Sequence, residues 1–145
     1  MLLETTDGSQ KGDVYRKLAN HYYSTDSNSQ AYEYIQMAIS EYSEAGDYLG
    51  VARANSLLGY IYVVWDNYER GLQAFLSAES IGRELKDQDI RIIALHGMAR
   101  IYSYLGNANK ALEVNRQGMA LARAEGLEDK VNGFRNNAAS IFGTM

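Results

Sequence analysis

Apolar positions along this chain recur at a fixed interval. At intervals of 40 residues stand four aromatic side chains: Tyr22, Tyr62, Tyr102 and Phe142. An apolar residue lies four positions before each of them, and a small residue lies three positions before. In the first three periods, small residues recur nine and sixteen positions after the aromatic. Because offsets of three, four and seven fall on one face of a helix, the pattern predicts helices in every period.

Turn and cap residues divide each period into two helices. Asp and Asn side chains can accept hydrogen bonds from the first free N–H groups of a helix, and Gly46, Gly106 and Gly126 suit left-handed C-terminal caps. The chain contains no proline. Residues 1–12 are expected to form a flexible segment. The predicted helices cover residues 13–24, 28–45, 47–64, 67–85, 87–104, 107–124 and 128–145.

A period between about 20 and 50 residues indicates a stack of similar units, each of which buries its apolar face against the next. Small residues at fixed places opposite large ones let two helices approach closely. We therefore predict an all-α protein. A stack of this kind offers an open surface rather than a closed pocket, which favours binding over catalysis.

The order of small and large residues resembles the tetratricopeptide repeat (TPR), whose consensus places Leu, Gly, Tyr, Ala, Phe and Ala at the same relative offsets. The resemblance covers residues 13–145. It implies a right-handed α-solenoid of three TPR-like helix pairs and a C-terminal seventh helix, over about 13–46, 47–86, 87–126 and 128–145.

Two features depart from the TPR pattern. The period of 40 exceeds the family's usual 34, so each helix should be longer by most of a turn. The proline that commonly closes the second helix is replaced by Ser43, Arg83 and Arg123. Such long repeats are similar to those in sensory and regulatory segments of bacterial signalling proteins, including some diguanylate cyclases and sensor kinases.

The seventh helix allows two interpretations. It is either a cap that covers the third repeat or the first half of a fourth repeat in a longer protein. A terminal cap should have a polar outer face, whereas this helix ends in Ile-Phe-Gly-Thr-Met, with Ile141 and Phe142 in register. In the second case the chain is a fragment, and an exposed apolar edge would promote self-association.

Composition excludes several classes of protein. The chain has no cysteine, which rules out disulfides and cysteine-ligated zinc and favours a reducing compartment, so we expect a cytoplasmic location. No apolar run approaches the roughly 20 residues that span a bilayer, so no membrane contact is expected within this segment. With 14 basic and 18 acidic residues, the net charge is −4. No basic block appears, which argues against nucleic acid as a partner.

Catalytic motifs are absent from the sequence. His21 and His96 have no serine or carboxylate at a spacing that completes a nucleophile and base arrangement. No phosphate loop, zinc-protease motif or calcium loop is present. We therefore expect no enzyme activity, no metal and no cofactor. The triplet Asp87-Gln88-Asp89 is interpreted as a helix N-terminus, and most of the 12 tyrosines are expected to pack between helices.

In the resembled family, the first helix of each pair lines a concave groove. When the groove positions of that family are transferred to this sequence, Arg16, Arg53 and Arg100 face one concavity of an acidic chain. Because arginine makes bidentate contacts to carboxylates, an extended and acidic peptide is the expected ligand. The alternative is that these arginines pair with carboxylates on neighbouring helices or stay solvated. The predicted binding residues are Arg16, Asn20, Tyr23, Arg53, Ser56, Tyr60, His96, Arg100, Tyr104 and Asn136.

The leading hypothesis is a non-enzymatic protein-interaction module. It would be the regulatory or sensory segment of a larger bacterial signal-transduction protein and would bind a peptide or partner domain in its groove. One alternative is a stand-alone TPR adaptor or scaffold. Another is an oligomerisation unit that pairs through its end helices, giving a homo-oligomer through the C-terminal helix. The family's carboxylate clamp for chaperone tails is only partly present, since Leu57, Ile93 and Gly97 replace its Asn and basic residues.

Overall fold

The structure is an all-α stack of helices, as the sequence predicts. The computed structural model describes residues 2–144, including the side chains of residues 8–143. This described part contains no strand, and none of its helices has the length and apolarity to cross a bilayer. The helices are α1 (Leu2–Ser24), α2 (Asn28–Ala45), α3 (Tyr48–Val64), α4 (Tyr68–Glu84), α5 (Gln88–Tyr104), α6 (Ala108–Ala124) and α7 (Glu128–Thr144).

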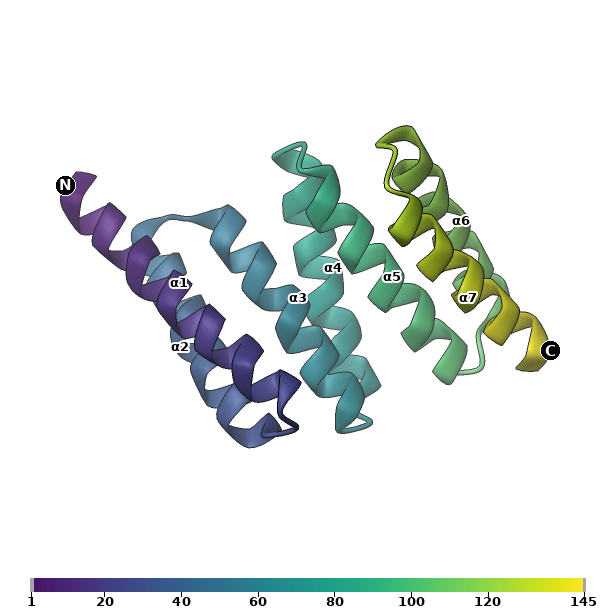
Figure 1. The fold of residues 1–145 in the computed structure, drawn as a ribbon, viewed down its shortest axis with the longest axis horizontal. Coiled ribbons are helices and arrows are strands. Elements are labelled where there is room, and N and C mark those ends of the chain that lie inside the picture. Colours follow the sequence, from purple (N-terminus) through teal and green to yellow (C-terminus); the bar gives the residue numbers. More distant parts are fainter. Residues whose placement is uncertain (1, 145) are drawn as a thin grey trace.

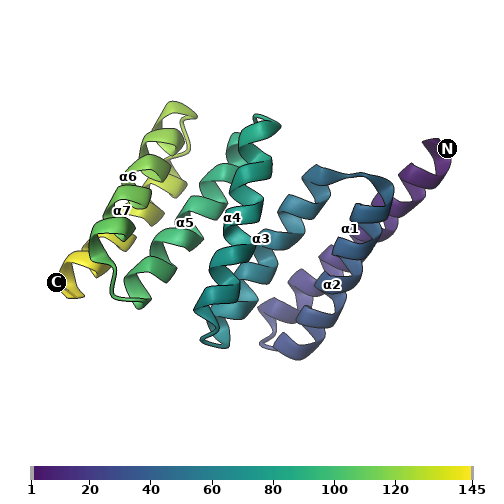
Figure 2. The same ribbon diagram turned by 180° about the vertical axis from the view of Figure 1, so that it is seen from behind.

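The helices form two rows. One row consists of α1, α3, α5 and α7 (Figure 1), and the other, consisting of α2, α4 and α6, lies in front in Figure 2. Each helix of the first row contacts the next helix of that row, whereas among the described residues α2, α4 and α6 contact only the helices before and after them in the chain. The first row is therefore the inner side of the stack, and the two termini lie at opposite ends of it.

Helix ends are fixed by the cap residues that the sequence singles out. Four Asp and Asn side chains each accept a hydrogen bond from the backbone N–H three residues on, at 2.9 to 3.4 Å: Asp47, Asn67, Asp87 and Asn107. Three turns contain a glycine with positive φ, a conformation that glycine adopts without steric cost: Gly46, Gly106 and Gly126. The predicted bounds of the helices from α2 to α7 agree with the observed ones to within one residue, although Ser27, the N-cap of α2, makes no side-chain cap hydrogen bond.

The first helix differs from the prediction. It begins at Leu2 and has 23 residues, so the expected flexible segment, as far as it is described, is helical. Gly8 and Gly12 suggest a linker, but both lie against α2. A Cβ at Gly8 would stand 2.9 Å from the nearest side-chain atom of α2, and one at Gly12 would stand 2.6 Å from the Tyr42 ring. These glycines thus let the first half of α1 pack along α2. If α1 began at residue 13, this part of α2 would be uncovered.

Aromatic rings pack against glycines where helices meet. Phe75 of α4 is fully buried between Gly59 of α3 and Gly97 of α5. A Cβ on Gly59 would come within 2.7 Å of the ring, and one on Gly97 within 2.3 Å, closer than real side-chain contacts. Tyr42 and Phe134 pack against glycines in the same way at the neighbouring junctions. The positions of the glycines therefore set how closely the helices approach.

The 40-residue register agrees with burial except at the two ends of the stack, where Leu18 is 36% exposed and Phe142 is also exposed. Small residues of the second helices are buried in all three repeats: Ala31, Gly71, Ala111, Ala38, Ala78 and Gly118. Asn115, which occupies the position of Phe75 one repeat later, is also buried and donates a hydrogen bond to the Phe134 carbonyl oxygen at 2.9 Å. Ile141 is 1% exposed, but Phe142 is 62% exposed, because no described helix covers its side of α7.

Candidate binding groove

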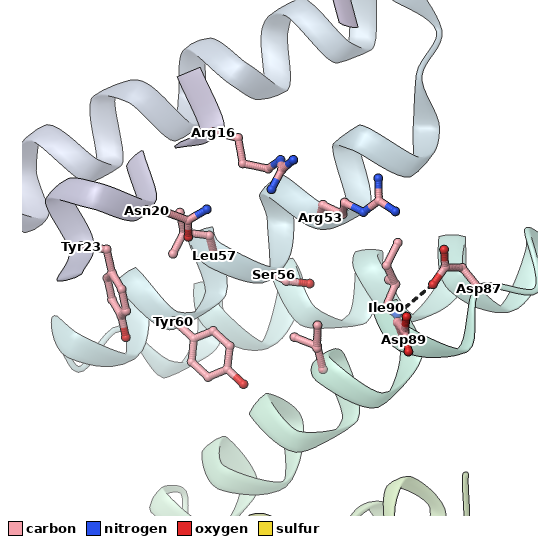
Figure 3. A pocket seen from close by; sticks show the side chains of 11 residues that line it. Arg16, Asn20, Tyr23, Arg53, Ser56, Leu57, Tyr60, Asp87, Asp89 and Ile90 are labelled. Carbon is pink, nitrogen blue, oxygen red and sulfur yellow. Dashed lines mark hydrogen bonds between the residues drawn. The ribbon is translucent and has the colours of Figure 1, made fainter. Parts of the chain in front are cut away.

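A cavity of about 460 Å³ opens on the inner row, where α1, α3 and the start of α5 meet (Figure 3). Six of the predicted binding residues line it: Arg16, Asn20, Tyr23, Arg53, Ser56 and Tyr60. The remaining lining residues are Leu57, Asp87, Asp89, Ile90 and Ile93. The TPR-like register thus brings together side chains from α1 and α3 that are about one repeat apart in the sequence.

The other four predicted binding residues lie elsewhere. His96 lines a second cavity, and Arg100 and Tyr104 line a shallow recess of about 40 Å³ near the end of α5. Asn136 is exposed on α7 and lines none of these cavities. Its neighbour Asn137 lines the recess instead and donates a hydrogen bond to the His96 carbonyl oxygen at 3.4 Å. One residue step turns a side chain by about 100° around a helix. The side chain of Asn136 therefore points away from the recess that Asn137 lines.

The three predicted arginines do not share one cavity. Arg100 donates a hydrogen bond to the Tyr104 hydroxyl at 3.1 Å, and its guanidinium carbon lies 5.9 Å from the centroid of that ring. These contacts keep Arg100 at the recess. Of the three arginines predicted to face one concavity, only Arg16 and Arg53 line the first cavity, and the side chain of Arg100 has an aromatic partner one helical turn along α5.

Two acidic residues that the sequence did not assign to the groove line the first cavity. Asp87 caps α5 by accepting a hydrogen bond from the Ile90 N–H at 3.0 Å, as the helix N-terminus interpretation requires. The same side chain and that of Asp89 lie beyond Arg53 in the cavity (Figure 3). Nothing in the sequence pattern separates an acidic cap that faces solvent from one that faces a groove. The cavity is therefore positive at α1 and α3 and negative at the start of α5.

Arg53 is the arginine available to a ligand. It is exposed on α3, and within the described part of the chain no ion pair or hydrogen bond joins its guanidinium group to another side chain. Figure 3 shows the guanidinium groups of Arg53 and Arg16 on neighbouring parts of the cavity wall. An unpaired arginine in a groove can form two parallel hydrogen bonds with a carboxylate.

Arg16 is held in place by a buried tyrosine. Its Nε donates a hydrogen bond to the Tyr42 hydroxyl at 3.1 Å, and that hydroxyl donates in turn to Asp13 Oδ1. A guanidinium nitrogen of Arg16 also lies 3.7 Å from the Asp13 carboxylate. Burial, and then the hydrogen bond to Asp13, raises the pKa of Tyr42 to about 12, so the phenol keeps its proton at neutral pH. Tyr42 lies on α2 outside the groove, and no periodicity of α1 could identify it as a partner of Arg16.

The groove continues from Tyr60 to His96. The Tyr60 hydroxyl and His96 Nδ1 are 3.3 Å apart. Burial raises the pKa of Tyr60 to about 12. The pKa of His96 is lowered, mainly by burial and then by the positive charges of Arg100 and Lys130, with a backbone hydrogen bond to Gly133 acting in the opposite direction. Both groups are therefore uncharged at neutral pH. Among the described residues no cluster of His, Asp and Glu could hold a metal ion.

Comparisons with known proteins support a helical repeat fold. No protein-family model matches the chain. Regulatory protein RapK of Bacillus subtilis (strain 168) is 26% identical over 113 residues, which cover 77% of this chain and 30% of RapK. The crystal structure of aspartyl phosphate phosphatase F from Bacillus subtilis matches with a TM-score of 0.76 at 14% identity, over 93% of this chain and 41% of that one. The chain thus spans less than half the length of either protein.

These similarities support the fold more directly than the activity. At 14% identity the structural match shows the fold alone, a helical repeat solenoid, which confirms the all-α solenoid prediction and supports the resemblance to TPR proteins in coarse form. One similar protein is named a regulatory protein and the other a phosphatase. Because one of these two proteins is named a phosphatase, the expected lack of enzyme activity in this chain stays a prediction.

Replacing Tyr42 with Phe should free Arg16 while leaving the core packed. The ring is fully buried and stays in place. The substitution removes two hydrogen bonds, so the expected loss in the free energy of unfolding is about 1–3 kcal/mol, the typical net value of two hydrogen bonds. In ¹⁵N NMR spectra, the Arg16 Nε–H should exchange with water faster than in the unchanged chain. Tyr48→Phe, at a position that is 65% exposed, is the matched control. Unchanged exchange at Arg16 would contradict the proposed role of Tyr42.

Lowering the pH should destabilise the fold through His96. Because burial lowers the pKa of His96 below its ordinary value of 6.5, the unfolded chain binds the proton more readily than the folded chain. The contribution of uncharged His96 to the free energy of unfolding is complete above the ordinary pKa of 6.5. It is lost as the pH falls through the lowered pKa of the folded chain. The free energy of unfolding, measured with urea between about pH 8 and about pH 5.5, should fall less in His96→Gln than in the unchanged chain. The control His21→Gln, at an exposed position, should retain the loss, and equal losses in both variants would exclude His96.

Proposed function

We propose that this chain is a non-enzymatic protein-interaction module of a bacterial regulatory protein, and that its inner-row cavity binds a peptide or an extended segment of a partner protein. The observation that carries the proposal is Arg53, an exposed arginine without an ion pair in the described residues, beside the pre-oriented Arg16. A side chain that is already held in position loses less conformational entropy on binding. The similarity to a protein named a regulatory protein supports this role.

The charges of the cavity describe the ligand further. Arg16 and Arg53 favour a carboxylate, whereas Asp87 and Asp89 at the other end repel one. A ligand that places an acidic group at α3 and a neutral or basic group at the start of α5 matches both ends, because like charges in an interface cost affinity. We expect a protein or peptide partner rather than nucleic acid, given the net charge of −4. The absence of cysteine supports a cytoplasmic location.

The cavity can be tested with synthetic hexapeptides. Peptides that carry Asp or Glu should bind more tightly than matched peptides with Asn or Gln, as measured by fluorescence anisotropy. Arg53→Glu should weaken the binding of the acidic peptides at least about tenfold, a loss of about 1.4 kcal/mol in binding free energy, while the helical circular dichroism is retained. Arg116→Glu, at an exposed position on α6, makes the same charge change outside the cavity. Equal affinity of the Arg53 variant, or an equal loss in the Arg116 variant, would remove the proposal.

The second candidate function is self-association through the C-terminal helix, which we prefer to the alternative of a stand-alone adaptor. The observation that favours it is the 62% exposure of Phe142 on α7. An exposed aromatic at the end of a repeat stack offers apolar area to a second copy. Ile141, which the sequence also places at this edge, is 1% exposed. It therefore belongs to the core, and a charge there would disrupt the fold rather than test the interface.

If two copies pair through α7, Phe142→Glu should produce monomers. Light scattering over a range of protein concentrations would show the mass fall to that of one chain. Leu76→Glu on α4, where the side chain is 44% exposed, adds the same charge on another helix and should leave the mass unchanged. A monomeric mass of the unchanged chain at all concentrations would exclude this candidate.

A further inference from the structure

A second cavity continues the first along the inner row. Its volume is about 340 Å³, and it lies between α3, α5 and the start of α7. Tyr60 and Ile93 line both cavities. A ligand that extends along the groove therefore passes from the charged cavity to the second one across these two side chains. The lining residues of the second cavity are Tyr60, Ile92, Ile93, His96, Asp129, Lys130, Gly133 and Phe134.

A missing side chain leaves this second cavity open. The groove position that recurs every 40 residues carries Asp13, Arg53, Ile93 and Gly133. Gly133 lies inside α7 without a positive φ, so its backbone accepts any L-residue. A Cβ there would be 3.5 Å from His96 Nε2, an ordinary van der Waals contact. The glycine is thus not required by close packing of helices, unlike the glycines that contact Phe75.

The second cavity is apolar at its base. Ile92 and Phe134 are fully buried there, and the rings of His96 and Phe134 meet edge to face with centroids 5.4 Å apart. Tyr60 supplies a further ring. Asp129 and Lys130 are exposed and carry opposite charges, so neither sign of ligand charge is favoured at the rim. The volume corresponds to about eleven water molecules at liquid density.

We propose that the second cavity is a specificity pocket for one uncharged aromatic side chain of the ligand. The inference rests on the proposed function, because it assigns a further subsite to the same peptide or protein segment. Aromatic rings pack favourably edge to face against other rings, and three rings of this chain border the cavity. A charged side chain would lose its hydration against Ile92 and Phe134 without gaining a partner of opposite charge at the base.

Indole is a suitable probe, because it carries an aromatic ring and no peptide backbone. In NMR titrations of the labelled chain, indole should shift the Gly133 amide and the methyl groups of Ile92 and Ile93. In Gly133→Leu the new side chain extends into the cavity, so these shifts should disappear or require at least about tenfold more indole. Largest shifts at distant residues, such as Phe142, would overturn the assignment of the pocket.

Gly143→Leu is the matched control. It makes the same substitution on the same helix, at a glycine whose added Cβ would have no atom within 4 Å. Indole should bind this variant as it binds the unchanged chain. Gly133→Ala is the second variant, since one methyl group fits the observed geometry and occupies only part of the cavity. If Gly133→Leu does not fold, weaker indole binding by Gly133→Ala supports the pocket, and unchanged binding overturns it.

Peptides then separate the failure of the pocket from that of the proposed function. Three hexapeptides share one acidic sequence and differ only in a Trp, a Leu or an Ala. Tighter binding of the Trp peptide, lost in Gly133→Leu and kept in Gly143→Leu, supports the pocket. Equal binding of all three overturns the pocket and leaves the role of Arg53 intact. Indole binding at Gly133 without binding of any peptide overturns the proposed function and, with it, the assignment to a peptide side chain.

Discussion

The packing of large rings against glycines determines the spacing of the helices in this molecule. Phe75 extends from the outer row between α3 and α5, and the glycines on those two helices contact its ring directly. Its position therefore fixes how far apart these inner-row helices stand, and hence the width of the groove between them. Interiors this closely packed tolerate little change in volume, and an extra methyl group costs about 1–3 kcal/mol. Phe75 also contacts Tyr60 edge to face at 4.9 Å, so the core supports the wall that the two cavities share.

The groove is built on this frame from positions that vary between repeats. The small packing positions of the second helices keep their size, while the side chain at one groove position is acidic, basic, aliphatic and then missing in successive repeats: Asp13, Arg53, Ile93 and Gly133. A repeat protein can change its ligand in this way without disturbing its core, because Arg53, Ile93 and Gly133 line the groove rather than the packed contacts between helices. The result here is a charged cavity next to an apolar one, with Tyr60 and Ile93 common to both.

Arg16 and Arg53 illustrate two ways of presenting the same chemical group. Arg16 is held by a phenol and a carboxylate, which orient its guanidinium group before a ligand arrives. Arg53 has no such partner within the described chain and is free to adapt. An oriented arginine loses little entropy on binding, whereas a free one can follow ligands of different shape. Together they suit a carboxylate whose position along the groove is fixed mainly at α1.

The sequence alone determined the order of the helices, the bounds of α2 to α7 and the small buried positions that recur in the second helices. These features depend on local caps and on a periodicity of 40 residues, both of which are visible in one dimension. It also identified six of the residues that meet in the first cavity, because the TPR-like register specifies which helix face points inward. Only the tertiary structure decided that Gly8 and Gly12 extend α1, that Tyr42 holds Arg16, and that Asp87 faces the groove. Each of these depends on contacts between different helices, and such contacts leave no periodic trace in the sequence.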